Sequence, residues 1–102
     1  MSIKNKLKIL QWNIRSIKAN KEYLLNFVFN EKPDLILLNE TWLKLNSPFI
    51  LKHYTICLLD RQDGYGGVAT CIKNNIIFQE VKRFSSENTQ YIITKISNFY
   101  MT

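Results

Sequence analysis

The chain has 102 residues and a mass of 12.1 kDa, which is enough for one small domain and too short for two. Hydrophobic residues make up 46% and charged residues 22%, a globular composition that excludes a disordered or collagen-like chain. No apolar run exceeds four residues and none follows the charged N-terminus, so the sequence predicts neither a membrane segment nor a secretory signal. We therefore expect an intracellular protein, nuclear or cytoplasmic.

The positive charge is concentrated near the N-terminus. The net charge is +6, from 14 basic and 8 acidic residues. The basic residues that precede the first acid, Glu22, are Lys4, Lys6, Lys8, Arg15, Lys18 and Lys21. Such a segment attracts polyanions such as nucleic acid, but a lysine-rich edge that only keeps the chain soluble has the same composition. Charge alone leaves both interpretations open.

The two cysteines, Cys57 and Cys71, have no CxxC partner, and His53 is the only histidine of the sequence. A structural zinc site needs four ligands at closer spacing. The sequence therefore predicts buried free thiols, because free cysteine is among the most buried residue types.

Two short apolar segments predict buried strands. Residues 7–14 (LKILQWNI) are mostly apolar, and Leu35-Ile36-Leu37-Leu38 is a continuous apolar run that we expect to be buried on both faces.

Between these strands the spacing of the apolar residues changes to that of a helix. Its apolar face is formed by Tyr23, Leu24, Phe27 and Val28. Asn20 is the expected N-cap. Pro33 sets the end of the helix, because the residue before a proline avoids helical backbone angles.

Strand, helix and strand joined in this way form a βαβ unit, whose two strands are expected to be parallel neighbours with a right-handed crossover. Their carboxyl ends then open at the same edge of the sheet, where α/β proteins bind ligands. Asn13 and the segment Asn39-Glu40-Thr41 follow these two strands, so the sequence places them at one edge.

After Pro48 the chain becomes β-rich. Turn-forming clusters separate short β-branched or aromatic runs, which are Tyr54–Leu59, Val68–Ile72, Ile76–Val81 and Gln90–Ile96. The last residues, 99–102, are expected to enter another strand. A βαβ unit followed by mostly antiparallel strands predicts an α+β fold or a mixed sandwich.

Glu40 and Asn13 are the candidate catalytic and metal-binding residues. A carboxylate after four apolar residues is desolvated unless a cation meets it. Mg²⁺ accepts one or two carboxylates and keeps several waters, so Glu40 suits such a site, although an N-cap or an ion pair with Lys44 is the structural alternative. Asn13 could orient a metal-bound water or a phosphate oxygen, or satisfy turn backbone. Of the flanking tryptophans, Trp12 is expected in the core and Trp42 in the cleft.

The glycine-rich segment Arg61-Gln62-Asp63-Gly64-Tyr65-Gly66-Gly67 precedes a predicted strand. Glycine allows positive φ and close backbone approach. The segment lacks the spacing of a phosphate-binding loop that opens a helix, so a tight turn explains it equally well.

Three blocks in order carry a family resemblance. They are Gln11-Trp12-Asn13-Ile14-Arg15-Ser16-Ile17, then Pro33 through Asn39-Glu40-Thr41-Trp42-Leu43, then Arg61 through Gly64-Tyr65-Gly66-Gly67-Val68-Ala69. Together they resemble the N-terminal part of the endonuclease/exonuclease/phosphatase superfamily, nearest to the apurinic-like endonuclease domain of jockey-type non-LTR retrotransposons. The resemblance covers roughly positions 6 to 97.

This resemblance implies the N-terminal portion of a four-layer α/β sandwich, with residues 1–102 forming a partial, truncated domain. It implies hydrolysis of phosphodiesters with Mg²⁺, or Mn²⁺ in its place, and nicking of DNA. Glu40 matches the metal-binding glutamate and Asn13 the active-site asparagine of the family. Arg15 stands where many members carry Asp or Asn, and with Trp42 and Arg61 it is a candidate contact to nucleic acid.

The family's later blocks, an Asp-x-Asn pair and a final Ser-Asp-His, are absent. We therefore expect the chain alone to be inactive and weakly stable. The resemblance to retrotransposon endonucleases also implies a reverse transcriptase of the same polyprotein as a partner. The alternative is a non-catalytic mobile-element remnant that binds nucleic acid weakly through its basic N-terminal segment. A lipid-phosphate hydrolase of the same fold is a third interpretation, which no residue of this sequence supports.

Overall fold

The computed structural model describes residues 2–3, 6–45 and 47–101, so Lys4 of the basic segment lies outside the described residues. One helix and seven strands follow in chain order: β1 (Ser2–Ile3), β2 (Ile9–Asn13), α1 (Ile17–Glu31), β3 (Leu35–Asn39), β4 (Tyr54–Leu59), β5 (Val68–Lys73), β6 (Ile76–Ser85) and β7 (Gln90–Met101).

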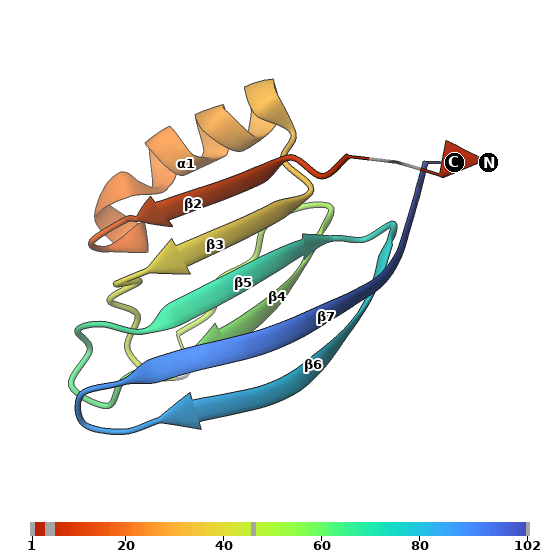
Figure 1. The fold of residues 1–102 in the computed structure, drawn as a ribbon. Coiled ribbons are helices and arrows are strands. Elements are labelled where there is room, and N and C mark those ends of the chain that lie inside the picture. The colour runs from red at the N-terminus through yellow and green to blue at the C-terminus, as the bar shows by residue number, and fades with distance from the viewer. Residues whose placement is uncertain (1, 4–5, 46, 102) are drawn as a thin grey trace.

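The strands form two sheets, and together with the helix they make an α+β sandwich (Figure 1). The larger sheet has the order β2-β3-β5-β4, and the smaller one has the order β1-β7-β6. β2 and β3 are parallel neighbours, as the sequence predicted, while β5 runs antiparallel to both β3 and β4. The expected fold class is therefore confirmed.

Alternation along β3 supplies a core on each face of the larger sheet. Ile36 and Leu38 are fully buried in one cluster with Leu24 of the helix. Leu35 points to the other face, where it joins a cluster with Ile72 and Ile76. Because successive side chains of a strand point to opposite faces, a central strand covered on both sides reads as a continuous apolar run. The prediction for residues 35–38 is confirmed except at Leu37, which is half-buried.

The helix begins earlier than the sequence indicated. Ser16 is the N-cap, and its Oγ accepts a 3.0 Å hydrogen bond from the amide of Ala19. Asn20, the expected cap, lies inside the first turns, and its Nδ2 donates instead to the carbonyl of Ile14 at 2.8 Å. The assignment of Asn20 was wrong because its side chain caps the preceding turn rather than the helix. The end is as predicted: Lys32 takes a left-handed conformation just before Pro33.

The expected apolar face of the helix is only half correct. Leu24 is fully buried and Val28 packs against the core, whereas Tyr23 and Phe27 are 74% and 40% exposed. Residues 24 and 28 lie one turn apart on the side that faces the sheet. Tyr23 and Phe27 lie next to that side, where the described residues leave them partly uncovered.

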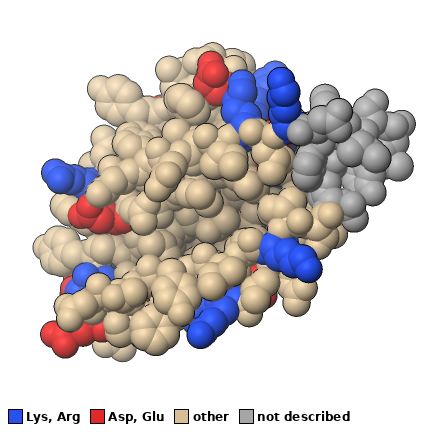
Figure 2. Space-filling model, in the orientation of Figure 1, with Lys and Arg blue, Asp and Glu red and all other residues tan. Residues whose placement is uncertain are grey.

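β2 is also less buried than its composition indicated. Its side chains alternate between exposed and half-buried, and Ile9 is 52% exposed. β2 lies at the end of the sheet order, and β7 packs over β5 and β4 rather than over β2. A hollow lined in part by Gln11, Leu37 and Ile92 lies beside it. Figure 2 shows that this face carries its charges near the rim and none in the middle.

Cys57 and Cys71 are free, as predicted, and they occupy opposite faces of the sheet. In the register of β4 and β5, Cys71 pairs with Ile56, one residue away from Cys57. Cys71 is buried and burial raises its pKa to about 12, so it stays a thiol. Cys57 is half-buried rather than fully buried.

The end of the chain does not form the separate strand expected from the sequence. Residues up to Met101 extend β7, which pairs with β6 along its length and with β1 near its end. Among the described residues, no helix has both the length and the apolar character needed to cross a bilayer.

Two positions on α1 test this division between core and surface. We expect Leu24→Ala to lower the free energy of unfolding by about 2–5 kcal/mol, because it removes a fully buried side chain. Phe29→Ala, at a residue that is 77% exposed, should change it by less than about 0.5 kcal/mol. Urea denaturation followed by circular dichroism measures both; equal losses would contradict the assigned core.

Candidate active site at the carboxyl edge of the larger sheet

Asn13 and Glu40 lie at the same edge of the larger sheet. Asn13 is the last residue of β2 and is in register with Asn39, the last residue of β3, and Glu40 follows directly. β4 runs in the same direction as β3, because both are antiparallel to β5, so Asp60 also follows a strand at this edge. Figure 1 shows the loops after all three strands at one end of the sheet.

Backbone hydrogen bonds fix the segment that carries Glu40 against the turn between β2 and α1. The amide of Ser16 donates to the carbonyl of Glu40 at 2.9 Å. The amides of Ile14 and Ile17 donate to the carbonyls of Asn39 and Thr41, each at 3.0 Å. The position of Glu40 relative to Asn13 is therefore set by the main chain and not by side-chain packing alone.

The glycine-rich loop holds the other side of the same segment. The amides of Thr41 and Trp42 donate to the carbonyls of Gly67 and Gly66 at 3.3 and 2.8 Å. A Cβ at Gly67 would lie 2.5 Å from Thr41 Oγ1, and φ there is +89°. The loop thus works as a tight turn that must approach Thr41 closely, one of the two roles that the sequence allowed.

Strained backbone gathers at this edge. Arg15, Ser16, Glu40 and Trp42 all have positive φ, at 46°, 89°, 52° and 54°. Such residues cost on the order of 1 kcal/mol each and persist only where the surroundings enforce them, most often at functional sites. Here the hydrogen bonds on both sides of residues 39–42 supply that enforcement.

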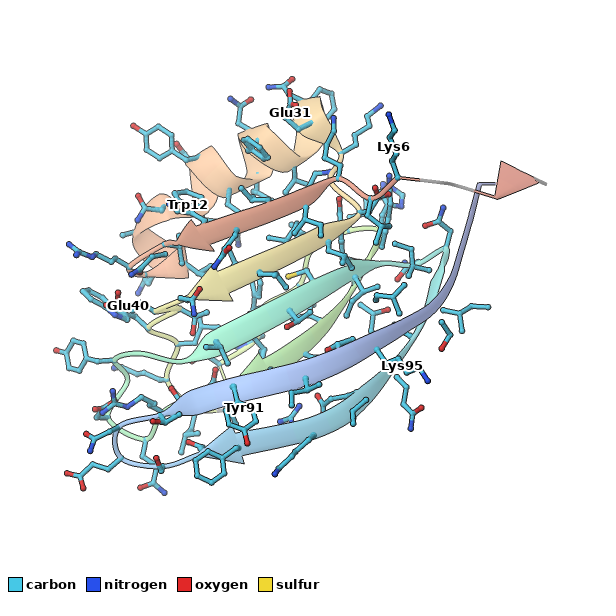
Figure 3. The ribbon with its side chains drawn as sticks, in the orientation of Figure 1. Lys6, Trp12, Glu31, Glu40, Tyr91 and Lys95 are labelled. Carbon is cyan, nitrogen blue, oxygen red and sulfur yellow. The ribbon has the colours of Figure 1, made fainter. Side chains whose placement is uncertain are left out.

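The Glu40 carboxylate is half-buried and has no hydrogen-bond or ion-pair partner among the described residues. The ion pair with Lys44 that the sequence allowed is therefore not formed within that part of the chain. Figure 3 shows Glu40 at the rim of the sheet, at the opposite end from Lys6. Asn13 is exposed and open to solvent.

These residues fit a divalent cation only as a partial site. Within residues 2–3, 6–45 and 47–101, no group of three or more His, Cys, Asp or Glu side chains could hold a metal. A half-buried carboxylate without a partner suits Mg²⁺, which takes one or two carboxylates and completes its shell with water and phosphate oxygens. Glu40 is the residue that would hold it, and Asn13 lies at the same edge of the sheet.

The three candidate nucleic-acid contacts at this edge differ in exposure and in the partners they already have. Arg15 is exposed. Trp42 is 37% exposed and meets the ring of Tyr65 edge-on, with centroids 5.5 Å apart. Arg61 is held by Asp63 at 2.7 Å, so its guanidinium already has an anionic partner. Trp12 packs partly against the core, as expected.

Asp60 is the residue of this edge that the sequence analysis did not single out. Its Oδ1 is buried and makes no hydrogen bond within the described structure, and burial raises its pKa. It borders a cavity of about 490 Å³ that Arg61, Asp63 and Glu87 also line, but not Asn13 or Glu40. The signal was present: like Glu40, Asp60 is an acid directly after an apolar strand.

Lys6 and Lys8, the described lysines before β2, lie away from this edge. Lys8 precedes β2, so about five residues of extended chain, roughly 16 Å, separate it from Asn13. Its Nζ lies 3.6 Å from Glu31 Oε1. Lys6 and Lys8 therefore do not add phosphate contacts next to Glu40.

Together, the fold and the site define an α+β sandwich that carries Glu40, an acid without a partner in the described structure, and the amide of Asn13 at the carboxyl edge of a mixed sheet. The endonuclease/exonuclease/phosphatase family model matches residues 10–102, and the chain belongs to this family. No curated protein matches it.

Two solved structures show the same architecture. The catalytic domain of Xenopus laevis APE2 is 31% identical with a TM-score of 0.59, and the match covers 72% of this chain and 26% of that one. The 3′ phosphatase NExo from Neisseria, bound to product DNA hairpin, is 19% identical with a TM-score of 0.61, over 74% of this chain and 32% of that one. The chain thus spans about a third or less of the length of these structures.

Gly67 and Gly64 form a matched pair for testing the loop. Gly64→Ala should cost about 1 kcal/mol, since φ is +78° there but the nearest atom, Lys44 Cγ, is 3.7 Å away. Gly67→Ala should cost at least about 2 kcal/mol, because it adds the clash with Thr41 to the backbone strain. Thermal unfolding of both variants measures the difference, and equal costs would contradict the close approach.

Asp60 gives a prediction for pH. Because burial raises its pKa, the folded chain holds this proton more tightly than the unfolded chain, so stability falls as pH rises above the unfolded value of about 3.9. We expect Asp60→Asn to raise Tm at pH 7.5, with a gain that shrinks as the pH is lowered toward 4. Asp63→Asn, at an exposed and paired carboxylate, should give no gain. A lower Tm for Asp60→Asn at pH 7.5 would contradict the assignment.

Proposed function

We propose that the chain is the N-terminal part of a Mg²⁺-dependent DNA endonuclease, with Mn²⁺ able to replace Mg²⁺. Its reaction is the hydrolysis of a phosphodiester to nick target DNA for retrotransposition, and a reverse transcriptase of the same polyprotein is its expected partner. Membership of a family of endonucleases, exonucleases and phosphatases supports hydrolysis of a phosphate ester. The three motif blocks, and the product DNA hairpin bound to NExo, support DNA as the substrate.

The single observation that carries this proposal is the unpaired Glu40 carboxylate. It is half-buried, the segment that carries it is hydrogen-bonded on both sides, and the described residues offer it no cation. Leaving a partly buried carboxylate without a partner costs stability. Such a group is better explained by a cation that it binds in function than by a structural role.

Each proposed site residue has its own task. Glu40 would hold the divalent cation, which when bound offsets negative charge on the phosphate and the leaving oxygen. Asn13 would orient a water or a phosphate oxygen without adding charge. Arg15 and Trp42 would contact the DNA backbone and a sugar or base. Arg61 would do so only by exchanging Asp63 for a phosphate.

The chain alone is proposed to be inactive. Glu40 and Asn13 have no neighbouring acid–histidine set within the described residues that would orient or deprotonate the attacking water. Catalytic groups act as a unit, so half of a set gives little rate enhancement.

Metal binding tests the role of Glu40 directly. Mn²⁺ added to the ¹⁵N-labelled chain should broaden the amide signals around Asn13 and Glu40 through paramagnetic relaxation. Glu40→Gln should weaken this binding at least tenfold, because it removes the only charged ligand, whereas Glu22→Gln on the exposed side of α1 should leave it unchanged. If the Glu40→Gln variant shows the same Mn²⁺-induced broadening as the unchanged chain, the proposed metal site is wrong.

Nicking and retention of duplex DNA separate the fragment from a non-catalytic remnant. We expect no detectable nicking of supercoiled plasmid by the chain with Mg²⁺; nicking that Glu40→Gln removes would show that the chain suffices.

Salt-dependent retention of duplex DNA that survives Glu40→Ala and is lost on charge reversal of Lys4, Lys6 and Lys8 would instead favour the remnant. The ion pair between Lys8 and Glu31 makes that second outcome the less expected one.

A further inference from the structure

A second concave surface lies at the end of the sheet opposite to Glu40. We call it the distal groove; it has a volume of about 400 Å³ and runs between the last turns of α1 and the segment that leads into β4. Its apolar lining comes from Leu25, Val28, Phe29, Leu51 and Tyr54. None of these residues belongs to the site described above.

The walls of the distal groove are fixed by the fold. Leu51 is 3% exposed and belongs to the main core. The hydroxyl of Tyr54 donates to the carbonyl of Pro33, which ties the start of β4 to the end of α1. Burial raises the pKa of Tyr54 to about 12, so this proton stays in place at neutral pH. The groove is therefore preformed.

Large apolar side chains remain open to water along the helix wall. Leu25 and Phe29, one helical turn apart, are 42% and 77% exposed. Their spacing makes a ridge of the kind against which an amphipathic helix packs. Apolar surface of this kind beside a groove marks an interaction site more often than an isolated exposed residue does.

The ionisable groups that line the distal groove are basic, apart from Tyr54. They are Lys32, Lys52, Lys73 and His53. Lys73 Nζ donates to the carbonyl of Lys32 at 3.5 Å, which keeps this lysine near the end of α1. Two acids lie on the adjoining elements. Glu31 pairs with Lys8, and buried Asp34 accepts from the amide of Lys8 and also contributes to the raised pKa of Tyr54.

We propose that the distal groove docks an acidic amphipathic segment of a partner protein. Two apolar side chains of the segment, one turn apart, would pack against Leu25 and Phe29, and its carboxylates would face the three lysines. The charges argue against a second copy of this chain, which carries +6 itself. The apolar floor argues against duplex DNA, because a duplex presents mainly phosphate and sugar to a surface groove and keeps its base faces stacked inside.

A random library tests the proposal without choosing a sequence in advance. Phage-displayed dodecapeptides are selected on the immobilised chain at 150 mM NaCl, and the enriched peptides are labelled with fluorescein for anisotropy titrations. We expect them to contain at least two acids and two large apolar residues. Lys52→Glu with Lys73→Glu, or Phe29→Ser alone, should weaken binding at least tenfold.

Matched variants outside the distal groove serve as controls. Lys82→Glu with Lys95→Glu makes the same change of charge on exposed positions of β6 and β7, and Tyr23→Ser removes an aromatic ring from the other side of α1. Both should leave affinity within twofold.

Three results would overturn the proposal. The first is a failure to enrich any peptide, or enrichment without acids. The second is a peptide affinity that does not change in the groove variants, or that falls as much in the control variants as in the groove variants. The third concerns a labelled 12-nucleotide single-stranded DNA. The proposal fails if the binding of this DNA is weakened by the Lys52 and Lys73 substitutions while the binding of every peptide is unaffected by them.

Discussion

The geometry of the candidate site depends on one constraint, the hydrogen bonding of residues 39–42 along both sides of their backbone. The turn between β2 and α1 donates three amides to this segment, and the segment in turn donates two amides to Gly66 and Gly67. The strained conformations of Glu40 and Trp42 can persist because these bonds leave the backbone no other arrangement. A half-buried acid is thereby held at the edge of the sheet, and the described part of the chain gives it no neutralising partner.

The parallel pairing of β2 and β3 gives the two ends of the sheet different chemistry. It brings both carboxyl ends, with Asn13 and Glu40, to one edge, and it sends Lys6 and Lys8, which precede β2, to the other. The distal groove lies at that second end, with Lys32, Lys52 and Lys73 around an apolar floor. Hydrolysis and partner binding would then use separate surfaces of one small fold.

Local composition explains most of the fold. The run Leu35–Leu38 predicted a strand buried on both faces, Pro33 predicted the end of the helix, and the β-branched runs predicted β4 to β7 with boundary errors at their ends only. Burial was harder to predict, because β2 has the composition of a central strand but lies at the end of the sheet order. The start of the helix was also misjudged, since Ser16 and Asn20 are both good capping residues and only the path of the turn decides between them.

The sequence by itself determined the class of fold, the family and the two residues, Asn13 and Glu40, on which the proposed chemistry rests, because apolar runs and motif blocks are local properties of the chain. Only the tertiary structure decided that Arg61 already has Asp63 and that a basic apolar groove lies at the far end. It also decided that, among residues 2–3, 6–45 and 47–101, Glu40 has no ion pair and the buried Asp60 Oδ1 has no hydrogen-bond partner. These facts depend on which side chains meet across long stretches of sequence, and no local pattern records such contacts.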